Sequence, residues 1–443
     1  MNQSEPKKGI SKISVKGFKS LVEECSIEIR PLTILAGANS SGKSSIMQPL
    51  LLMKQTLESA TDYGALRLNG DNISFTSAQQ ILSYAQNREQ TDNFTVEVSF
   101  TDTSKFKNTF KKPIKKPLDL VESIYYNYDG KTKLTIKLTI GMNSEEVFQS
   151  LSPYFNQLIP SINPSQIQTH NWGVVRHFCF ILFCNYDNVD KSPSFPFNQP
   201  SFRFSNQIPK IIHVQGFRTL ERVLPVTGVG QNFSGDFVKY VASLIRSWQE
   251  SNSEKLEKLN SDLINLNLAK SIEANVINDT QIELKVSRSL DSDDMVNIVD
   301  VGSGVSQVLP VLVALVVAEP DQLVYLEEPE IHLHPLAQAN LGETIVNAAN
   351  RGVRVVLETH SDLLLRRIQS LVAEDKIAPD KAILHWFSRD EAGFTKIIST
   401  ALNETGAYNN SDFPLDFTDV FLDEEGRYLD AASAKRWKEQ NEH

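Results

Sequence analysis

The chain has 443 residues, of which 41% are hydrophobic and 22% are charged, and its formal net charge is −10. This length predicts two to three domains with a sizeable core, and the composition is that of an ordinary globular protein. No stretch approaches ~20 consecutive apolar residues and the first residues are polar, so neither a membrane-spanning helix nor a signal peptide is expected. Because the net charge is negative, the surface as a whole is not expected to attract nucleic acid.

The three cysteines limit the sulfur chemistry that the chain can carry. Cys25, Cys179 and Cys184 are too few and too scattered for a disulfide framework or a zinc cluster. We therefore expect the protein in a reducing cytoplasm.

The first predicted elements are strands, a loop and a helix. Residues 12–36 have the alternation and β-branched content of two strands and a turn, which lead into a third, apolar strand. After Gly37 comes a turn rich in glycine and serine, and residues 44–60 then carry apolar side chains at helical spacing. The order of strand, glycine loop and helix is therefore predicted near the start.

This loop carries a phosphate-binding pattern. It fits G-x-x-x-x-G-K-[ST] in full, and the required strand and helix flank it. Its backbone N–H groups are expected to cradle phosphates, Lys43 to reach the β- and γ-phosphates, and the Ser44 hydroxyl to bind Mg²⁺. The predicted nucleotide-binding residues are Gly37, Ala38, Asn39, Ser40, Ser41, Gly42, Lys43, Ser44 and Ser45.

The middle of the chain is less regular. Residues 94–100 and 133–141 alternate as antiparallel strands do, whereas residues 192–207 are rich in proline, serine and asparagine and are expected to form loops. Residues 235–270 have helical periodicity with charged faces but no sustained heptads.

One basic run stands out against the acidic total. Such a run could neutralise phosphates of a nucleic acid, but an exposed loop broken by prolines is the more usual origin of a charge run and is favoured here. The lysines of this run are Lys105, Lys107, Lys111, Lys112, Lys115 and Lys116.

From residue 296 the sequence predicts a Gly-rich turn, an apolar helix, a strand, a second helix and a second strand. Strands that alternate with helices imply a mostly parallel sheet covered on both faces. The first of these strands ends at Glu327 and Glu328, at the sheet edge where α/β proteins bind ligands. We expect Glu327 to hold Mg²⁺, through water, and Glu328 to orient or deprotonate the attacking water.

Three histidines near these strands are further candidates. His360 follows the second strand and is predicted to contact the γ-phosphate, although a histidine in a turn with satisfied hydrogen bonds would look the same if it stood alone. His332 and His334 form a His-x-His pair, but no third ligand lies nearby in the sequence, so a metal site is disfavoured.

Together these motifs resemble the ABC-type ATPases of the SMC/RecF-like group. The opening GFKSL with LTILAGANSSGKSS is similar to their first hairpin and Walker A loop, LVYLEEPEIHLHP to their Walker B and D-loop, and LETHSD to their switch-histidine segment. The segment with Gly302, Ser303 and Gly304 occupies the place of their signature motif. The resemblance covers residues 10–60 and 295–370.

The resemblance implies an α/β fold, with a mostly parallel P-loop sheet, an antiparallel β-lobe and a long α+β insertion. The expected divisions are residues 1–95 with Walker A, an insertion over 96–290, residues 291–395 with the signature, Walker B and switch histidine, and a small segment over 396–443. Within the group, the pairing of PEIHLHP with ETHSD and the segment at 413–430 resemble prokaryotic AAA-type ATPases that are often encoded in anti-phage defence systems.

The sequence also departs from the group's pattern. Glu327 replaces the usual aspartate of Walker B, Gly302 stands where a serine is usual, and Val305 replaces a polar residue. The nearest candidates for a Q-loop glutamine are Gln79 and Gln80.

The resemblance implies an ATPase that binds ATP and Mg²⁺ and closes as a homodimer or a higher homo-oligomer, with the signature turn of one copy capping the nucleotide of another. One expected role is a defence ATPase that controls a partner effector such as a nuclease or toxin. The alternative is a DNA-repair or DNA-maintenance ATPase that binds DNA directly. A transporter subunit would need a membrane partner, and the long insertion and altered signature argue against it.

Overall fold

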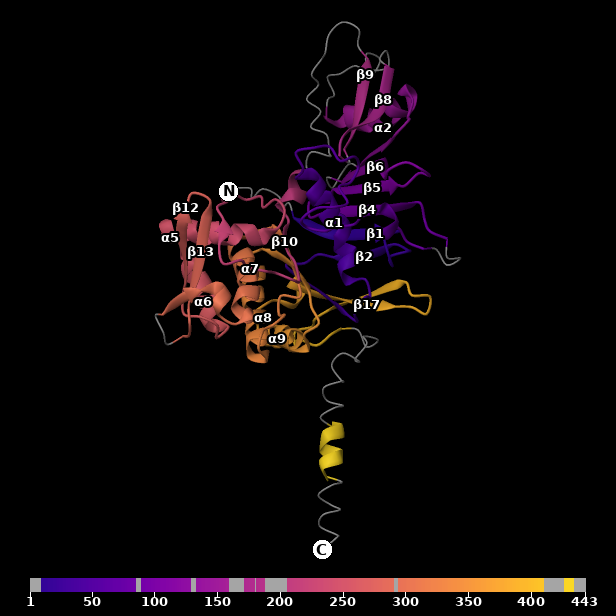
Figure 1. Ribbon diagram of the computed structural model, residues 1–443. Coiled ribbons are helices and arrows are strands. Elements are labelled where there is room, and N and C mark those ends of the chain that lie inside the picture. Colours follow the sequence, from indigo (N-terminus) through magenta and orange to yellow (C-terminus); the bar gives the residue numbers. More distant parts are fainter. Residues whose placement is uncertain are drawn as a thin grey trace, which may run out of the picture.

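The computed structural model describes residues 9–84, 89–128, 133–158, 171–179, 181–187, 205–290, 294–409 and 426–433. Two six-stranded sheets dominate the described chain (Figure 1). One is mostly parallel and carries the candidate site, and the other is antiparallel and forms a separate lobe beside helix α1.

The mostly parallel sheet has the strand order β10-β15-β16-β3-β17-β18. All neighbours are parallel except β17 and β18, which form an antiparallel hairpin at one edge. Its central strands are continuous apolar runs, as expected for strands covered on both faces. The bounds are β3 Leu32–Gly37, β10 Ile212–Val214, β15 Leu323–Glu327, β16 Arg354–Glu358, β17 Ala382–Arg389 and β18 Thr395–Ala401.

The antiparallel sheet has the order β2-β1-β4-β5-β6-β7. Its strands alternate buried and exposed side chains, because one face packs on the core and the other meets solvent. Phe94 stacks on Phe110 of the neighbouring strand with ring centroids 5.0 Å apart. The bounds are β1 Ile10–Lys16, β2 Cys25–Glu28, β4 Asn93–Phe100, β5 Lys105–Lys111, β6 Asp119–Tyr128 and β7 Lys133–Thr139.

Two hydrophobic cores lie on opposite faces of the parallel sheet. Side chains alternate along a strand, so Ile34 and Ala36 of β3 point into one core while Leu35 points into the other. The second core joins the sheet to α1 (Lys43–Leu57) and the antiparallel lobe. The strand ends between the two cores are therefore firmly held.

Helices and a small sheet cover the face of the parallel sheet that lies opposite α1. Helix α7 is buried along almost its whole length, which explains its apolar sequence. The helices of this side are α5 Val241–Glu250, α6 Glu254–Asn265, α7 Ser303–Val317, α8 Pro335–Asn350 and α9 Asp362–Ala373. The small sheet contains β11 Leu224–Pro225, β12 Ile272–Asn278, β13 Gln281–Ser287 and β14 Met295–Asn297. Helix α2 (Ser144–Leu158) and the hairpin of β8 (Asn171–Phe178) and β9 (Ile181–Asp187) lie at the far end of the antiparallel lobe (Figure 1).

The α/β prediction is confirmed, with its mostly parallel sheet, antiparallel lobe and additional α+β segments. The boundary expected between residues 95 and 96 falls inside β4, and β10, from the expected insertion, joins the parallel sheet. The division into four segments otherwise stays a prediction. Residues 192–204 of the expected loop and residues 413–425 of the C-terminal segment lie outside the described residues.

The basic run was favoured as an exposed, proline-broken loop, and this is wrong for its first half. Lys105, Lys107 and Lys111 lie on β5, where they alternate with the buried Phe106 and Phe110. The alternation of lysine and aromatic residues is that of a strand with one face in solvent. Within the described segments, no helix combines the length and the apolar character needed to cross a membrane.

Candidate functional site

The loop between β3 and α1 needs glycine at two positions. Gly37 has φ 134° and Gly42 has φ 106°, values that favour glycine. A Cβ on Gly37 would clash with the carbonyl of Phe387, and one on Gly42 would clash with the Thr395 hydroxyl. The two glycines therefore allow the loop to pack closely against the β17–β18 hairpin.

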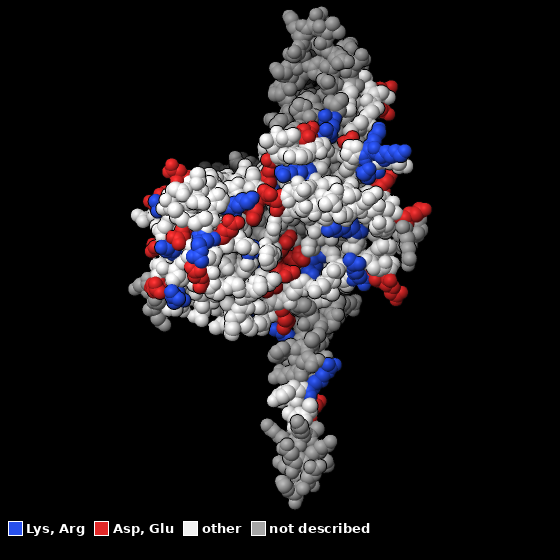
Figure 2. Space-filling model, viewed as in Figure 1, with Lys and Arg blue, Asp and Glu red and all other residues white. Residues whose placement is uncertain are grey.

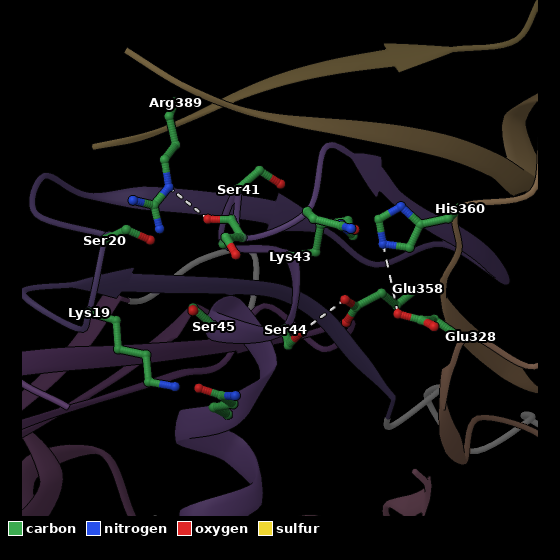
Figure 3. A pocket seen from close by; sticks show the side chains of 14 residues that line it. Lys19, Ser20, Ser41, Lys43, Ser44, Ser45, Glu328, Glu358, His360 and Arg389 are labelled. Carbon is green, nitrogen blue, oxygen red and sulfur yellow. Dashed lines mark hydrogen bonds and ion pairs between the residues drawn. The ribbon is translucent and has the colours of Figure 1, made fainter. Parts of the chain in front are cut away.

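The same hairpin supports the loop by hydrogen bonds. Thr395 Oγ1 donates to the Ser41 carbonyl at 2.8 Å, and Arg389 Nε donates to the Ser40 carbonyl at 2.7 Å. Figure 3 shows Arg389 reaching the loop from the strand above it. Two carbonyls of the loop are thus satisfied from outside, which helps to hold the loop in one conformation.

Lys43 is the first residue of α1, and its side chain folds back over the loop. Its Nζ donates to the carbonyls of Gly37 and Ala38, each at 3.0 Å. Burial lowers the pKa of Lys43, while the nearby carboxylates of Glu358 and Glu328 act to raise it. The ammonium group therefore stands between the loop and two acids.

Glu358 is the carboxylate nearest to Ser44. The Ser44 hydroxyl donates to Glu358 Oε1 at 2.8 Å, and the Tyr325 hydroxyl donates to Oε2 at 2.7 Å (Figure 3 shows the first bond). Burial raises the pKa of Glu358 to about 7, and Glu327 adds to this, while the hydrogen bonds and Lys43 oppose it. Glu358 is not among the site residues predicted from the sequence. The signal was available, since Glu358 ends a strand two residues before His360.

Glu327 lies beside Glu358 in the sheet register but has other partners. His213 Nε2 lies 3.1 Å from Glu327 Oε1, and the N–H of Gly216 donates to Oε2 at 3.2 Å. Burial acts to raise the pKa of Glu327, but the hydrogen bonds from His213 and Gly216 leave it below its usual value. His213 belongs to β10, so an element from the middle of the chain holds this acid.

Glu328 adopts a strained backbone conformation at the end of β15. Its φ is 42°, which is uncommon for a residue with a side chain. Its N–H donates to the Glu358 carbonyl at 2.8 Å, and its own carbonyl accepts from Ile331 at 3.2 Å. Its Oε1 lies 3.8 Å from Nε2 of His360. Burial lowers the pKa of His360, as does Lys43, so the neutral imidazole is favoured near pH 7.

Glu330 anchors the segment that carries His360. Its Oε1 accepts from Thr359 Oγ1 at 2.6 Å and from the N–H of His360 at 3.0 Å. The carboxylate is buried, which raises its pKa. In the sequence, Glu330 stands out only as part of the PEIHLHP motif, which does not predict this contact.

One cavity of about 630 Å³, a size typical of ligand sites, is lined by Lys43, Ser44, Glu328, Glu358 and His360, whereas Glu327 and Glu330 do not line it. Most of the predicted loop residues meet there with Glu328 and His360. The lining residues that sequence reasoning did not select are Lys19, Ser20, Gln48, Glu358 and Arg389.

Other predicted residues lie elsewhere in the described chain. Gly302 is the N-cap of α7, and Ser303 and Gly304 follow it; none of the three lines this cavity. Gln79 and Gln80 line a neighbouring cavity that shares Lys19 with the first. The ring of His334 accepts from the N–H of Leu336 and caps helix α8, whereas His332 is exposed.

No curated protein sequence matches the chain. Solved structures that are similar to it include the SMC head bound to the C-winged helix domain of ScpA, with 14% identity, a TM-score of 0.49, and coverage of 89% of this chain and 98% of that chain. A second is the SMC head domain with a coiled coil and joint from Pyrococcus yayanosii, with 11% identity, a TM-score of 0.47, and coverage of 90% and 98%.

A third is the SMC head domain from Thermotoga maritima, with 11% identity, a TM-score of 0.38, and coverage of 88% of this chain and 98% of that chain. A family model described as "AAA domain, putative AbiEii toxin, Type IV TA system" matches residues 32–366. That match runs from the strand before the phosphate loop to the helix after His360. The chain therefore belongs to this family of AAA domains.

Proposed function

We propose that this protein binds ATP with Mg²⁺ and hydrolyses the bond between its β- and γ-phosphates. The observation that carries this proposal is the convergence of Lys43, Ser44, Glu328, Glu358 and His360 on one cavity. A cation for phosphate, a hydroxyl beside a carboxylate and a second carboxylate beside a neutral histidine are the groups that phosphoryl transfer to water requires. The family of AAA domains to which the chain belongs is consistent with this chemistry.

Phosphate binding follows from the loop and from α1. The N-terminus of this 15-residue helix points its unpaired N–H groups and positive dipole end at the cavity. Lys43 would exchange its loop carbonyls for phosphate oxygens, which bind an ammonium more strongly because they carry charge.

The oxygen donors of Ser44 and Glu358 suit Mg²⁺, which is usually held by one or two carboxylates together with phosphate and water. Ser44 and Glu358 would hold the ion directly. Glu327 would contact it only through a water molecule, because His213 and Gly216 already hold its carboxylate. When bound, the ion supplies positive charge that offsets the charge of the phosphates.

Glu328 is the proposed base. Its carboxylate lines the cavity beside His360 and is 40% exposed, so a water molecule can reach it. The hydrogen bonds that hold the Glu328 backbone direct this side chain, and Glu330 holds the backbone of His360. His360 would contact the γ-phosphate as a neutral group and lose that contact after hydrolysis.

The active form is proposed to be a homodimer. Gly302 and Ser303 are exposed at the start of α7, where N–H groups are available to an anion. They do not line the cavity of their own chain, and a second copy could place them on the phosphates bound at Lys43. Closure around two nucleotides would then depend on the γ-phosphate.

The proposed role is control of a partner effector, such as a nuclease or toxin, in cytoplasmic anti-phage defence. The family description names a putative toxin of a toxin–antitoxin system, and this association with toxins supports the proposed role. In this scheme, nucleotide-dependent closure holds or releases the effector.

The alternative is an ATPase that binds DNA directly, and the lysines of β5 are the feature that would favour it. Basic side chains gather over the antiparallel lobe at the upper right of Figure 2, but acidic side chains are interspersed over the same face. Lys105 Nζ lies 3.7 Å from Glu97 Oε1, and Lys111 Nζ lies 3.1 Å from Asp92 Oδ2. These pairs reduce the charge available to phosphates, so the effector role is preferred.

Two substitutions test the ATPase. Lys43→Ala is expected to abolish both ATP binding and hydrolysis, because it removes the cation of the loop. Glu328→Gln keeps the shape of the side chain and removes the base, so it is expected to retain ATP binding, to lose hydrolysis and to accumulate a dimer in the presence of ATP. Nucleotide binding, phosphate release and mass by light scattering measure the three effects.

Exposed Glu391→Gln is a matched control for the loss of one carboxylate, and it is expected to behave as the unchanged protein. Hydrolysis at the normal rate by Glu328→Gln would show that another group is the base. ATP binding that survives Lys43→Ala unchanged would overturn the proposed site.

A further inference from the structure

Arg218 is a fully buried cation outside the cavity, in the segment that follows β10. Its side chain is only 1% exposed, although arginine is almost never buried without partners. It donates to four backbone carbonyls: Gln307 at 2.7 Å, Gln215 at 2.7 Å, Glu327 at 3.0 Å and Glu328 at 3.3 Å. One guanidinium thus connects its own segment with helix α7 and with the end of strand β15.

Gln307 completes a clamp with Arg218. The backbone N–H of Arg218 donates to Gln307 Oε1 at 3.3 Å, and Gln307 Nε2 donates back to the Arg218 carbonyl. Gln307 lies on α7, four residues after Ser303. The clamp therefore attaches residue 218 to the beginning of the helix whose N-terminus is proposed to cap a nucleotide of the second copy.

The charge of Arg218 is retained in this buried place. Burial lowers its pKa to about 10, and the carboxylates of Glu330, Glu327 and Glu328 oppose that effect. A guanidinium presents its donors in a rigid planar fork, whereas an ammonium does not. The four carbonyls must therefore keep fixed positions relative to one another for all these bonds to form.

The carbonyl of Glu328 is the critical acceptor. Glu328 has a left-handed backbone conformation, and such strain persists only where surrounding contacts enforce it. The segment after Glu328 also packs against the start of α7, since a Cβ on Gly304 would lie 3.4 Å from the His332 carbonyl. Two independent contacts thus connect the beginning of α7 with the backbone around Glu328.

We propose that Arg218 is a positioning residue that, with Gln307, couples the start of α7 to the orientation of Glu328. This inference rests on the proposed function, in which Glu328 activates water and α7 caps the nucleotide of a second copy. A shift of the first turns of α7 on capping moves Gln307, and Arg218 transmits that shift to the carbonyls of Glu327 and Glu328. Hydrolysis in one copy thereby becomes dependent on capping by the other.

The test compares Gln307→Leu and Arg218→Lys with a matched control. Gln307→Leu keeps the helix and removes the side-chain half of the clamp, and Arg218→Lys keeps the charge without the planar fork. Arg354→Lys is the control, since Arg354 is also buried and donates to a backbone carbonyl, that of Ile29 at 3.3 Å, at the opposite end of its strand.

Both clamp variants are expected to lower kcat by about ten-fold or more, because small displacements of a catalytic group are costly. Their affinity for a fluorescent ATP analogue should stay within about two-fold of the unchanged protein, since the phosphate loop is intact. Their Hill coefficient for ATP should fall towards one. Arg354→Lys should leave kcat, affinity and the Hill coefficient unchanged.

An unchanged kcat and Hill coefficient in folded Gln307→Leu would overturn the inference, as would an equal loss in Arg354→Lys. If Arg218→Lys does not fold, Gln307→Leu decides alone, with thermal unfolding confirming its fold. Failure of the unchanged protein to bind or hydrolyse ATP would instead refute the proposed function. The two failures are therefore distinguishable.

Discussion

The Ser44 hydroxyl, at the start of α1, donates a hydrogen bond of 2.8 Å to Glu358, at the end of β16. These residues are 314 positions apart in the sequence. Their contact joins the phosphate loop to the strand that precedes His360. It also places the carboxylate of Glu358 beside a proposed metal ligand, Ser44, whereas the sequence prediction had selected Glu327.

The first prediction compares the two carboxylates. Glu358→Gln removes a charge next to Ser44 and should raise the Mg²⁺ concentration needed for half-maximal nucleotide binding by about 10–100-fold. Glu327→Gln should have a smaller effect, since His213 and Gly216 hold that carboxylate. Titration with Mn²⁺, followed by its paramagnetic resonance in the presence of ADP, measures ion binding independently of turnover.

The order of the two effects decides the assignment. A larger shift for Glu327→Gln than for Glu358→Gln would return the direct metal contact to Glu327. Exposed Glu391→Gln serves as the control for a loss of one negative charge, and it should leave the titration unchanged.

The second prediction concerns Glu330 and His360. Glu330→Ala leaves the Thr359 hydroxyl and the His360 N–H without their acceptor in a buried place, so it should lower the free energy of unfolding by about 1–3 kcal/mol. It should also lower kcat, because His360 loses its fixed backbone position. Chemical denaturation and steady-state hydrolysis measure the two effects.

Comparison with His360→Ala separates stability from positioning. If Glu330 acts on turnover through His360, the double variant should lose no more kcat than His360→Ala alone. Fully additive losses of kcat would show that Glu330 affects turnover by another route.

The third prediction concerns the buried thiols. Burial raises the pKa of Cys25 to about 11 and that of Cys179 to about 12, with nearby acids adding to both effects. At pH 8 the fraction of either thiol that is ionised to thiolate, the reactive form, is then on the order of one in a thousand or less. Both residues should react slowly with iodoacetamide in the folded protein and rapidly in guanidinium chloride.

Peptide mass spectrometry at several times distinguishes each cysteine. The rate for Cys25 should rise about ten-fold for each pH unit between 8 and 10, because the thiolate fraction does so below the pKa. Native labelling of Cys179 as fast as in the denatured chain would contradict its burial.

The phosphate loop was predictable because its determinants are local. Eight consecutive residues specify the turn and its donors, and the flanking strand and helix are read from simple periodicity. The same holds for Glu328 and His360, since each follows a recognisable apolar strand. Most of the loop residues line one cavity together with Glu328 and His360, as the alignment of strand ends at one sheet edge requires.

Lys19 and Arg389 were beyond such reasoning. Both line the cavity, but they come from the turn after β1 and from the last position of β17. A lone basic residue in either segment looks like an ordinary surface charge. Only the packing of the β17–β18 hairpin on the loop brings Arg389 to the Ser40 carbonyl.

Local patterns in the amino-acid sequence predict the α/β pattern, the phosphate loop with Lys43 and Ser44, and the acidic and histidine strand ends. These depend on short-range rules of turn geometry and side-chain periodicity. Two contacts become visible only in the folded chain: Ser44 bonds to Glu358 rather than to Glu327, and Arg218 donates to the carbonyls of residues 327 and 328. The reason is physical: strand order in a parallel sheet and the direction of each side chain at its edge arise from pairings between distant segments, which no local pattern contains.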